Sequence, residues 1–203
     1  VVMMEYTITG FMPVILASTT GAVVSQLAYG SQPAFSVPSV QLASLFDLPW
    51  IAVTALLIGL VAGAFVRLAK PATWQTRWPV WVRFLAVGLA VGAVAWWYPQ
   101  VQGMGYDSLE RMLVGEPALD VLIVVALGKL ALTALAIAFG VPVSIIGPIL
   151  VAGAAFGTLC GLLWATLLPG LASSPVVFSL LGMAAMMGAV LQAPLAALMA
   201  LLE

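Results

Sequence analysis

The fold is decided by the stretch GVPVSIIGP, residues 140–148, in which two prolines bracket a mostly apolar segment. Proline favours the first turn of a helix and disrupts a helix interior, so we predict that a new helix begins near residues 146–148. The apolar run before the stretch, residues 118–139, also has the length of a membrane helix. The break therefore falls inside the bilayer, where irregular backbone is tolerated only if protein buries it or it lines a wet cavity.

A helix that begins inside the membrane has a chemical property of its own. Its first N–H groups lack partners within the helix, and its dipole places partial positive charge at the same end. Such an end suits an anion. The alternative is a structural helix that proline merely kinks, but the combination of Pro142 and Pro148 with Ser144 favours an ion path.

The composition defines the broad class of protein. Apolar residues make up 64% of the chain, charged residues only 6%, and the mean hydropathy is +1.21. Soluble domains carry about 25% charged residues, so this chain cannot cover a water-facing surface. Strands of a membrane barrel would show alternating polarity, which is missing here. We predict an all-α, polytopic membrane helix bundle with broken and tilted helices, in contact with the lipid bilayer.

Several classes of function find no support in the residues. The net charge is −1 and histidine is absent, so nucleic-acid binding is not expected. The lack of histidine, together with the single Cys160, argues against zinc, haem and thiol–imidazole chemistry. An intramembrane enzyme would need Asp pairs, a Ser–His pair or His–Glu ligands within its spans. We therefore expect no enzyme, no catalytic residue, no metal and no cofactor.

The apolar runs divide the chain into predicted helices. Both ends of the chain look like interrupted helices, so we treat residues 1–203 as one transmembrane domain fragment. The predicted helices cover residues 11–28, 49–66, 80–97, 118–139, 148–168, 175–191 and 194–202, with a short amphipathic helix at 107–114. The last of the apolar segments is too short to cross a core of about 30 Å. Short, proline-interrupted segments are typical of broken helices in transporters. Four of the six Lys and Arg residues lie between 67 and 83, which predicts that this loop is cytoplasmic.

Six short motifs follow one another along the second half of the chain. They are GMGYD (103–107), GKLALTAL (128–135), GVPVSIIGP (140–148), GAAFG (153–157), GMAA (182–185) and QAPL (192–195). In order and spacing they resemble the second half of the membrane domain of the CLC family of voltage-gated chloride channels and chloride/proton antiporters. The resemblance implies one inverted repeat of a CLC-like fold.

The resemblance also implies an anion site at the break. In this family a dehydrated halide lies within the membrane, held by main-chain amides at helix N-termini and by a few hydroxyls. Ile145 and Ile146 match the two positions whose N–H groups contact the anion, and Ser144, Gly147 and Pro148 would line its path. Neutral dipoles offset part of the cost of dehydration without trapping the ion.

Some residues of the break depart from the family pattern. The usual Gly-Gly is Val143-Ser144 here, the usual Phe is Ile146, and the usual Ala is Gly147. Loss of glycine limits positive-φ geometry, while Ser144 either adds a hydroxyl donor or caps the helix. The identity of the anion is left open by these changes: chloride is the first expectation, and fluoride, nitrate or another small anion is an alternative.

Three charged residues in apolar surroundings need a reason to be there. Glu5 matches the end of an earlier helix of the family, and Tyr6 follows it where antiporters carry a proton-transfer Glu. Glu5 is then either a substitute on a proton path or a residue at the membrane interface, as Glu203 is expected to be. For Lys129, we expect its long side chain to reach an interface rather than to act on the anion.

The resemblance leads to a full functional expectation. It implies passive or proton-coupled transport of chloride, or of another small anion, through a pore lined by helix N-termini. It further implies a homodimer, formed through residues 11–28 and 175–202, and a missing N-terminal half of the same protein. We expect a multi-pass protein in the plasma (inner) membrane of a prokaryote. The alternatives are a structural membrane subunit that transports nothing and a transporter for a different anion such as fluoride.

Overall fold

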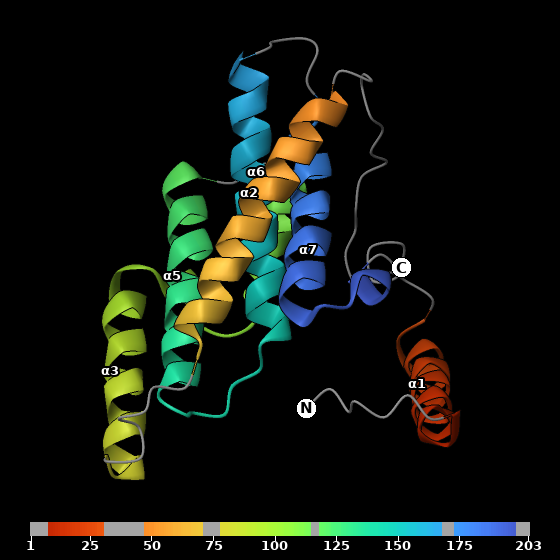
Figure 1. Cartoon of the computed structure of the whole chain (residues 1–203), viewed down its shortest axis with the longest axis vertical. Helices are drawn as coiled ribbons and strands as arrows, with labels where there is room; N and C mark the ends of the chain where they lie inside the picture. Colours follow the sequence, from red (N-terminus) through yellow and green to blue (C-terminus); the bar gives the residue numbers. More distant parts are fainter. Residues whose placement is uncertain (1–7, 31–46, 71–77, 115–117, 168–172, 198–203) are drawn as a thin grey trace. The chain divides into compact units, whose positions relative to one another are not determined.

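The computed structural model describes residues 8–30, 47–70, 78–114, 118–167 and 173–197 (Figure 1). The chain divides into two compact units, Val1–Ser36 and Val37–Glu203. The first unit contains helix α1, Ile8–Tyr29, with Pro13 inside it. The hydroxyls of Ser18, Thr19 and Thr20 donate to carbonyls three or four residues earlier, so these polar side chains are satisfied within the helix.

The described residues of the second unit form helices joined by turns and short irregular segments. Its elements are α2 (Asp47–Leu68), α3 (Val80–Trp97), the 3₁₀ helix η2 (Pro99–Val101), α4 (Tyr106–Val114), α5 (Leu119–Ala138), α6 (Ile146–Leu167) and α7 (Pro175–Leu191). Four of these, α2, α3, α5 and α6, are long and apolar enough to cross a membrane. The described residues contain no strand, which confirms the predicted all-α membrane bundle. Of the predicted helix 194–202, residues 194–197 are helical and 198–202 lie outside the described residues.

Helix α6 lies at the centre of this unit, with α5, α2 and α7 packed around it (Figure 1). One buried cluster joins the four helices: Ile58, Ala62 and Phe65 from α2, Leu130 and Ala134 from α5, Ile149 and Ala152 from α6, and Met186 from α7. Because the α6 members of this cluster are Ile149 and Ala152, the first turns of α6 are held in place by packing against three other helices.

Glycines let α6 and α7 approach until their backbones touch. A Cβ atom on Gly157 would overlap the carbonyl oxygen of Phe178, and one on Gly182 would overlap the carbonyl oxygen of Gly153. The four-residue spacing of Gly153 and Gly157 predicts such close packing. Glycines at the same spacing in α2 and α3, such as Gly59, have nothing within 4 Å of an added Cβ. Spacing alone therefore does not tell which glycines form a helix contact.

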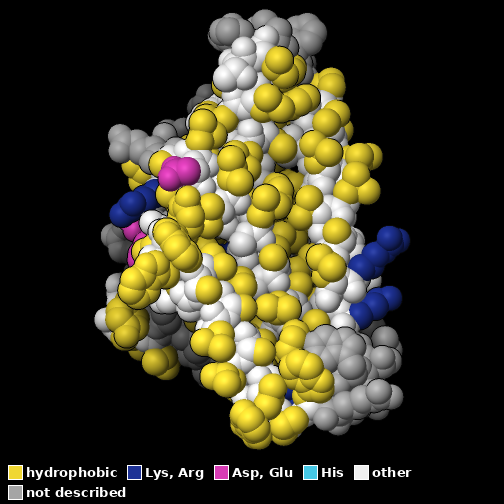
Figure 2. Space-filling view, turned by 90° about the vertical axis from the view of Figure 1, so that its left-hand side faces the viewer, with side chains coloured by type: hydrophobic (Ala, Val, Ile, Leu, Met, Phe, Trp, Pro, Cys, Tyr) yellow, Lys and Arg dark blue, Asp and Glu magenta, His cyan; other side chains and the backbone are white. Residues whose placement is uncertain are grey.

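The outer surface of the helices is apolar. Leu60 and Leu127 are each more than half exposed, and only 11% of the residues of α3 are buried. On the face shown in Figure 2, hydrophobic side chains predominate and charged side chains lie near the margins. A surface of this kind is stable against lipid tails and unfavourable in water, so the chain is a multi-pass membrane protein.

A buried carboxylate ties the beginning of α2 to two other segments. Asp47 is fully buried and accepts hydrogen bonds from Trp164 Nε1 at 2.8 Å and from the hydroxyl of Ser173. Trp50 stacks on Trp164 with ring centroids 4.8 Å apart and donates its own indole N–H to the carbonyl of Cys160. The cluster joins the start of α2 to the end of α6 and to the residue range that precedes α7.

Candidate functional site

The break between α5 and α6 begins with a helix-ending turn at Gly140. This glycine has φ +71°, its N–H donates to Ile137 O at 2.8 Å, and the N–H of Val141 donates to Ala136 O at 2.9 Å. These two bonds form a Schellman motif, which needs a left-handed residue that glycine adopts without strain. Pro142 follows and cannot continue the helix, so α5 ends where the sequence predicts a break.

Helix α6 begins at Ile146, within the range 146–148 in which the sequence predicts a new helix. Its first hydrogen bond runs from Ile149 N to Ile145 O at 3.1 Å, so Pro148 lies in the first turn, where its missing N–H removes no intrahelical bond. Within the described residues, the main-chain amides of Ile145, Ile146 and Gly147 donate to no acceptor. The first turn of α6 thus presents three consecutive N–H groups without partners.

The predicted path residues differ in their exposure. Ser144 is exposed and Ile146 is 52% exposed, whereas Ile145 packs partly against the core cluster. Pro148 is half-buried and Gly147 is buried: a Cβ atom on Gly147 would lie 3.6 Å from Met104 Cβ. The Ser144 hydroxyl makes no hydrogen bond within the described residues, so it does not cap α6.

Arg83 connects the end of α5 to the beginning of α3. Its Nη1 donates to the carbonyl oxygen of Phe139 at 3.3 Å, and the Phe139 ring lies edge-on to Trp78 with centroids 6.5 Å apart. A cation at the last carbonyls of a helix is favourable because of the helix dipole. The contact also places the end of α5 beside the first turns of α3, which carry Arg83.

Lys129 contradicts the expectation from the sequence. It lies in the middle of α5, only 2% exposed, and its Nζ contacts the carbonyl oxygens of Gln100 (3.4 Å), Val101 (3.1 Å) and Gln102 (3.3 Å). The prediction that it reaches an interface is wrong, because carbonyls at the end of η2 provide acceptors inside the bundle. Its position halfway along an apolar run, away from both ends, is the signal that points to burial.

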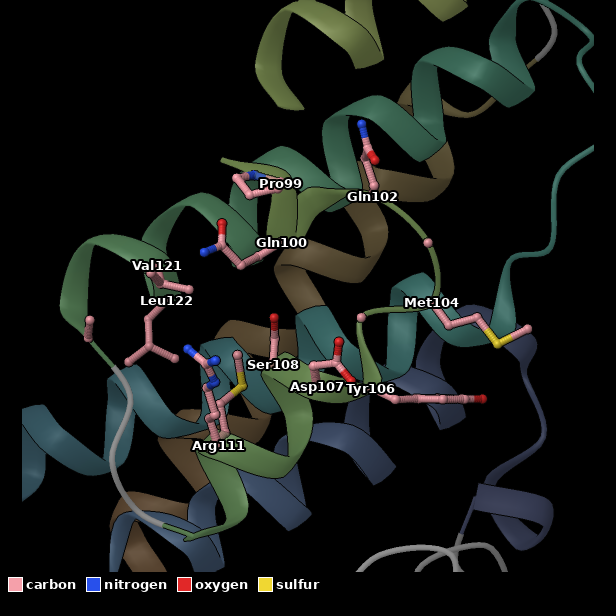
Figure 3. Close-up of a pocket in the computed structure, with 14 residues that line it drawn as sticks. Pro99, Gln100, Gln102, Met104, Tyr106, Asp107, Ser108, Arg111, Val121 and Leu122 are labelled. Carbon is pink, nitrogen blue, oxygen red and sulfur yellow. The ribbon is translucent and has the colours of Figure 1, made fainter. Parts of the chain in front are cut away.

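A pocket of about 560 Å³ adjoins the site (Figure 3). Gln100 from η2 and Ser108 and Arg111 from α4 give it polar walls, and Val121 from α5 an apolar one. Met104 also lines the pocket, and in Figure 3 its side chain points away from the group formed by Gln100, Ser108 and Arg111. None of the residues that line the pocket belongs to α6, so the turn of residues 103–105 lies between the pocket and the first turn of α6.

Glu5, the possible proton-path residue, and Glu203 lie outside the described residues. No group of three or more His, Cys, Asp or Glu that could hold a metal occurs in the described part of the chain. What the described residues bring together is a set of neutral donors at the start of a membrane helix.

Comparison with known proteins gives the class of this helix bundle. The model of the voltage gated chloride channel family matches residues 1–203, so the chain belongs to this family. The chain is 31% identical to chloride channel protein CLC-f of Arabidopsis thaliana over 94% of its length. It is 29% identical to a putative ClcB-like chloride channel protein of Ralstonia nicotianae over 94%. It is 25% identical to the H(+)/Cl(-) exchange transporter ClcA of Vibrio campbellii over 98%.

The chain is shorter than these relatives. It spans 27% of the Arabidopsis protein, 45% of the Ralstonia protein and 44% of the Vibrio protein. Family membership confirms the resemblance carried by the six motifs.

Proposed function

We propose that the protein to which this chain belongs transports a small anion, with chloride as the first candidate, and that the main-chain amides of Ile145 and Ile146 contact it. The observation that carries the proposal is the set of unpartnered N–H groups in the first turn of α6 in a chain of the chloride channel family. Chloride is the first candidate because relatives are named as a chloride channel protein and as an H(+)/Cl(-) exchange transporter.

The chemistry of the site fits a mobile anion. An anion that enters a membrane protein loses hydration, and neutral N–H dipoles replace part of it without the strong binding of a Lys or Arg. The exposed hydroxyl of Ser144 stands next to the amides and adds a donor. We propose that Gly147 and Pro148 complete this wall of the path, Gly147 next to Met104 and Pro148 in the first turn, where its missing N–H removes no intrahelical bond.

The rest of the path comes from outside this chain. Ser144 and Ile146 are exposed, so an ion there is not enclosed by the described residues. We propose that the N-terminal half of the same protein encloses the ion and that two copies form a homodimer through residues 11–28 and 175–202. The share of the relatives' length that the chain spans supports the first part of this proposal.

Proton coupling is the finer part of the proposal. The relatives are named both as channels and as an H(+)/Cl(-) exchange transporter, so we propose transport that is either passive or proton-coupled, with Glu5 on the proton path. They come from bacteria and from a plant, and the prokaryotic plasma membrane stays a prediction.

The test uses the protein as its gene encodes it, purified and reconstituted into liposomes loaded with chloride. Anion efflux is recorded with a chloride electrode after valinomycin is added to dissipate the potential, and external pH is recorded in parallel. Chloride efflux supports the proposal. Proton uptake into the liposomes during that efflux, seen as a rise of the external pH, identifies an exchanger. A protein that only has a structural role gives liposomes as tight to chloride, nitrate and fluoride as empty ones, and this result would refute the proposal.

A further inference from the structure

A buried cation in the middle of a membrane helix is the feature that the anion site leaves unexplained. Lys129 is 2% exposed, and its Nζ has three contacts, all with main-chain carbonyls. Within the described residues no carboxylate lies at ion-pair distance from it. Burial of an ammonium group without a counter-charge is unfavourable, so the position of Lys129 needs an explanation, and the three carbonyl contacts are where it must be sought.

Those carbonyls belong to consecutive residues at the end of η2. The last carbonyls of a helix have no partners within the helix, and the ammonium of Lys129 provides donors for them. Val101 is itself buried and its side chain lies against α5 at Gly128. Lys129 thus fastens the chain that leaves η2, residues 100–102, to the middle of α5.

The turn after η2 closes over the ammonium group. Gly105 has φ +80°, and a Cβ atom on it would lie 2.8 Å from Lys129 Nζ, 3.0 Å from Cε and 3.3 Å from Val151 Cγ1. Glycine adopts this φ without strain, and a larger residue here would displace the end of the Lys129 side chain or the turn itself. Gly103 also has a positive φ, +60°, but nothing lies within 4 Å of an added Cβ there. Gly103 is thus required only for its backbone conformation, whereas Gly105 has both a positive φ and close neighbours.

The turn reaches the anion site through its middle residue. Met104, between the two glycines, lies against Gly147 in the first turn of α6, with its Cβ and Cγ both 3.6 Å from the position of an added Cβ. Lys129, the turn and α6 therefore form a continuous series of contacts that ends one residue from the free amide of Ile146.

We propose that Lys129 is a positioning residue: it holds the turn of residues 100–105 against the first turn of α6 and so sets the direction of the amides of Ile145 and Ile146. This inference rests on the proposed anion site. Lys129 acts through hydrogen bonds to the turn and touches no ion itself. Because N–H direction sets how an anion of given size and shape is coordinated, release of the turn changes the discrimination between anions as well as the rate.

The experiment compares variants that alter the turn with and without a change of charge. Lys129→Met removes the charge and the donors, whereas Gly105→Ala keeps the charge and forces Nζ and the turn apart. Gly103→Ala is the matched control, because it introduces the same positive-φ strain without a steric contact. Met104→Ala removes Cγ from the contact with Gly147 while Cβ stays, so it loosens the contact, and it serves if the Gly105 variant fails to fold. Chloride and nitrate efflux from proteoliposomes are measured per unit of folded protein, after size-exclusion chromatography.

We expect Lys129→Met and Gly105→Ala to lower chloride efflux about tenfold each and to shift the chloride-to-nitrate ratio, with Gly103→Ala close to wild type. Met104→Ala shifts the same ratio. The double variant Lys129→Met with Gly105→Ala falls little below either single one, because both release the same turn.

Two results would overturn the inference. One is a loss in Lys129→Met while both Gly105→Ala and Met104→Ala keep the wild-type rate and ratio, since the charge would then act through space. The other is a loss of folded protein only, with the rate and the ion ratio per folded molecule unchanged. If wild-type protein moves neither anion, the proposed function itself fails, which is a separate outcome seen before any variant is made.

Discussion

The indole N–H of Trp164 donates a 2.8 Å hydrogen bond to the fully buried carboxylate of Asp47, which joins the last part of α6 to the first residue of α2. The carboxylate also accepts from the hydroxyl and the N–H of Ser173, and it stands at a helix N-terminus, where negative charge is favourable. The pair therefore fixes one end of the helix whose other end carries the candidate anion site.

Asp47→Ala is expected to destabilise the protein strongly. It leaves the half-buried indole N–H of Trp164 and the buried hydroxyl of Ser173 without this acceptor, which costs about 3 kcal/mol. Asp120→Ala is the control, because Asp120 also lies in the first turn of a spanning helix but is exposed. Thermal unfolding in detergent, followed by tryptophan fluorescence, measures both variants. Equal melting temperatures for the two variants would contradict the assigned role of Asp47.

Gly157→Ala is expected to force α6 and α7 apart. The new methyl group overlaps the carbonyl oxygen of Phe178, and overpacking of this kind costs about 1–3 kcal/mol. Gly59→Ala is the matched control in α2, because an added Cβ meets nothing there and alanine favours helix by about 0.5–1 kcal/mol. The two variants should shift the melting temperature in opposite directions. A shift of the same sign and size would show that the α6–α7 contact is looser than described.

Much of the fold can be predicted from the sequence because membrane helices are long, apolar and end at recognisable residues. The break at residues 140–148 is marked by Gly140 and Pro142, each of which ends a helix for a local reason. Local patterns say less about partners in space. The acceptors of Lys129 are carbonyls some thirty residues earlier in the chain, and nothing near Lys129 in the sequence reveals them.

The same limit applies to Asp47, because no residue near it in the sequence signals its burial. Its partners Trp164 and Ser173 lie 117 and 126 residues further along the chain. The anion site lies between these two cases. Free amides at the start of α6 follow from the position of the break, whereas the contact of Gly147 with Met104 depends on how two distant segments pack.

Ser144→Ala tests whether the exposed hydroxyl beside the amides contacts the anion. Ser144 makes no hydrogen bond within the described residues, so its loss leaves stability within about 0.5 kcal/mol of wild type. If the hydroxyl donates to the ion, chloride affinity measured by calorimetry falls about threefold to tenfold. Ser18→Ala, whose hydroxyl bonds within α1, is the control and keeps wild-type affinity. A drop in melting temperature without a change in affinity would make Ser144 a structural residue instead.

Ile146→Pro tests the amides themselves. Ile146 is the first residue of α6, the position where proline fits a helix best, and its N–H has no acceptor within the described residues. The substitution therefore removes one donor from the site at little expense to the helix. Loss of one hydrogen bond to a charged ligand weakens chloride binding about tenfold.

Ile146→Val is the control for Ile146→Pro, because it trims a half-exposed side chain and keeps the N–H. Calorimetric titration of chloride into both purified variants gives the comparison, and circular dichroism checks that helix content is unchanged. Weaker binding in the proline variant alone assigns the contact to the main-chain amide. Equal affinity in proline, valine and wild-type proteins would mean that the ion does not contact this amide, and the anion site would have to lie elsewhere.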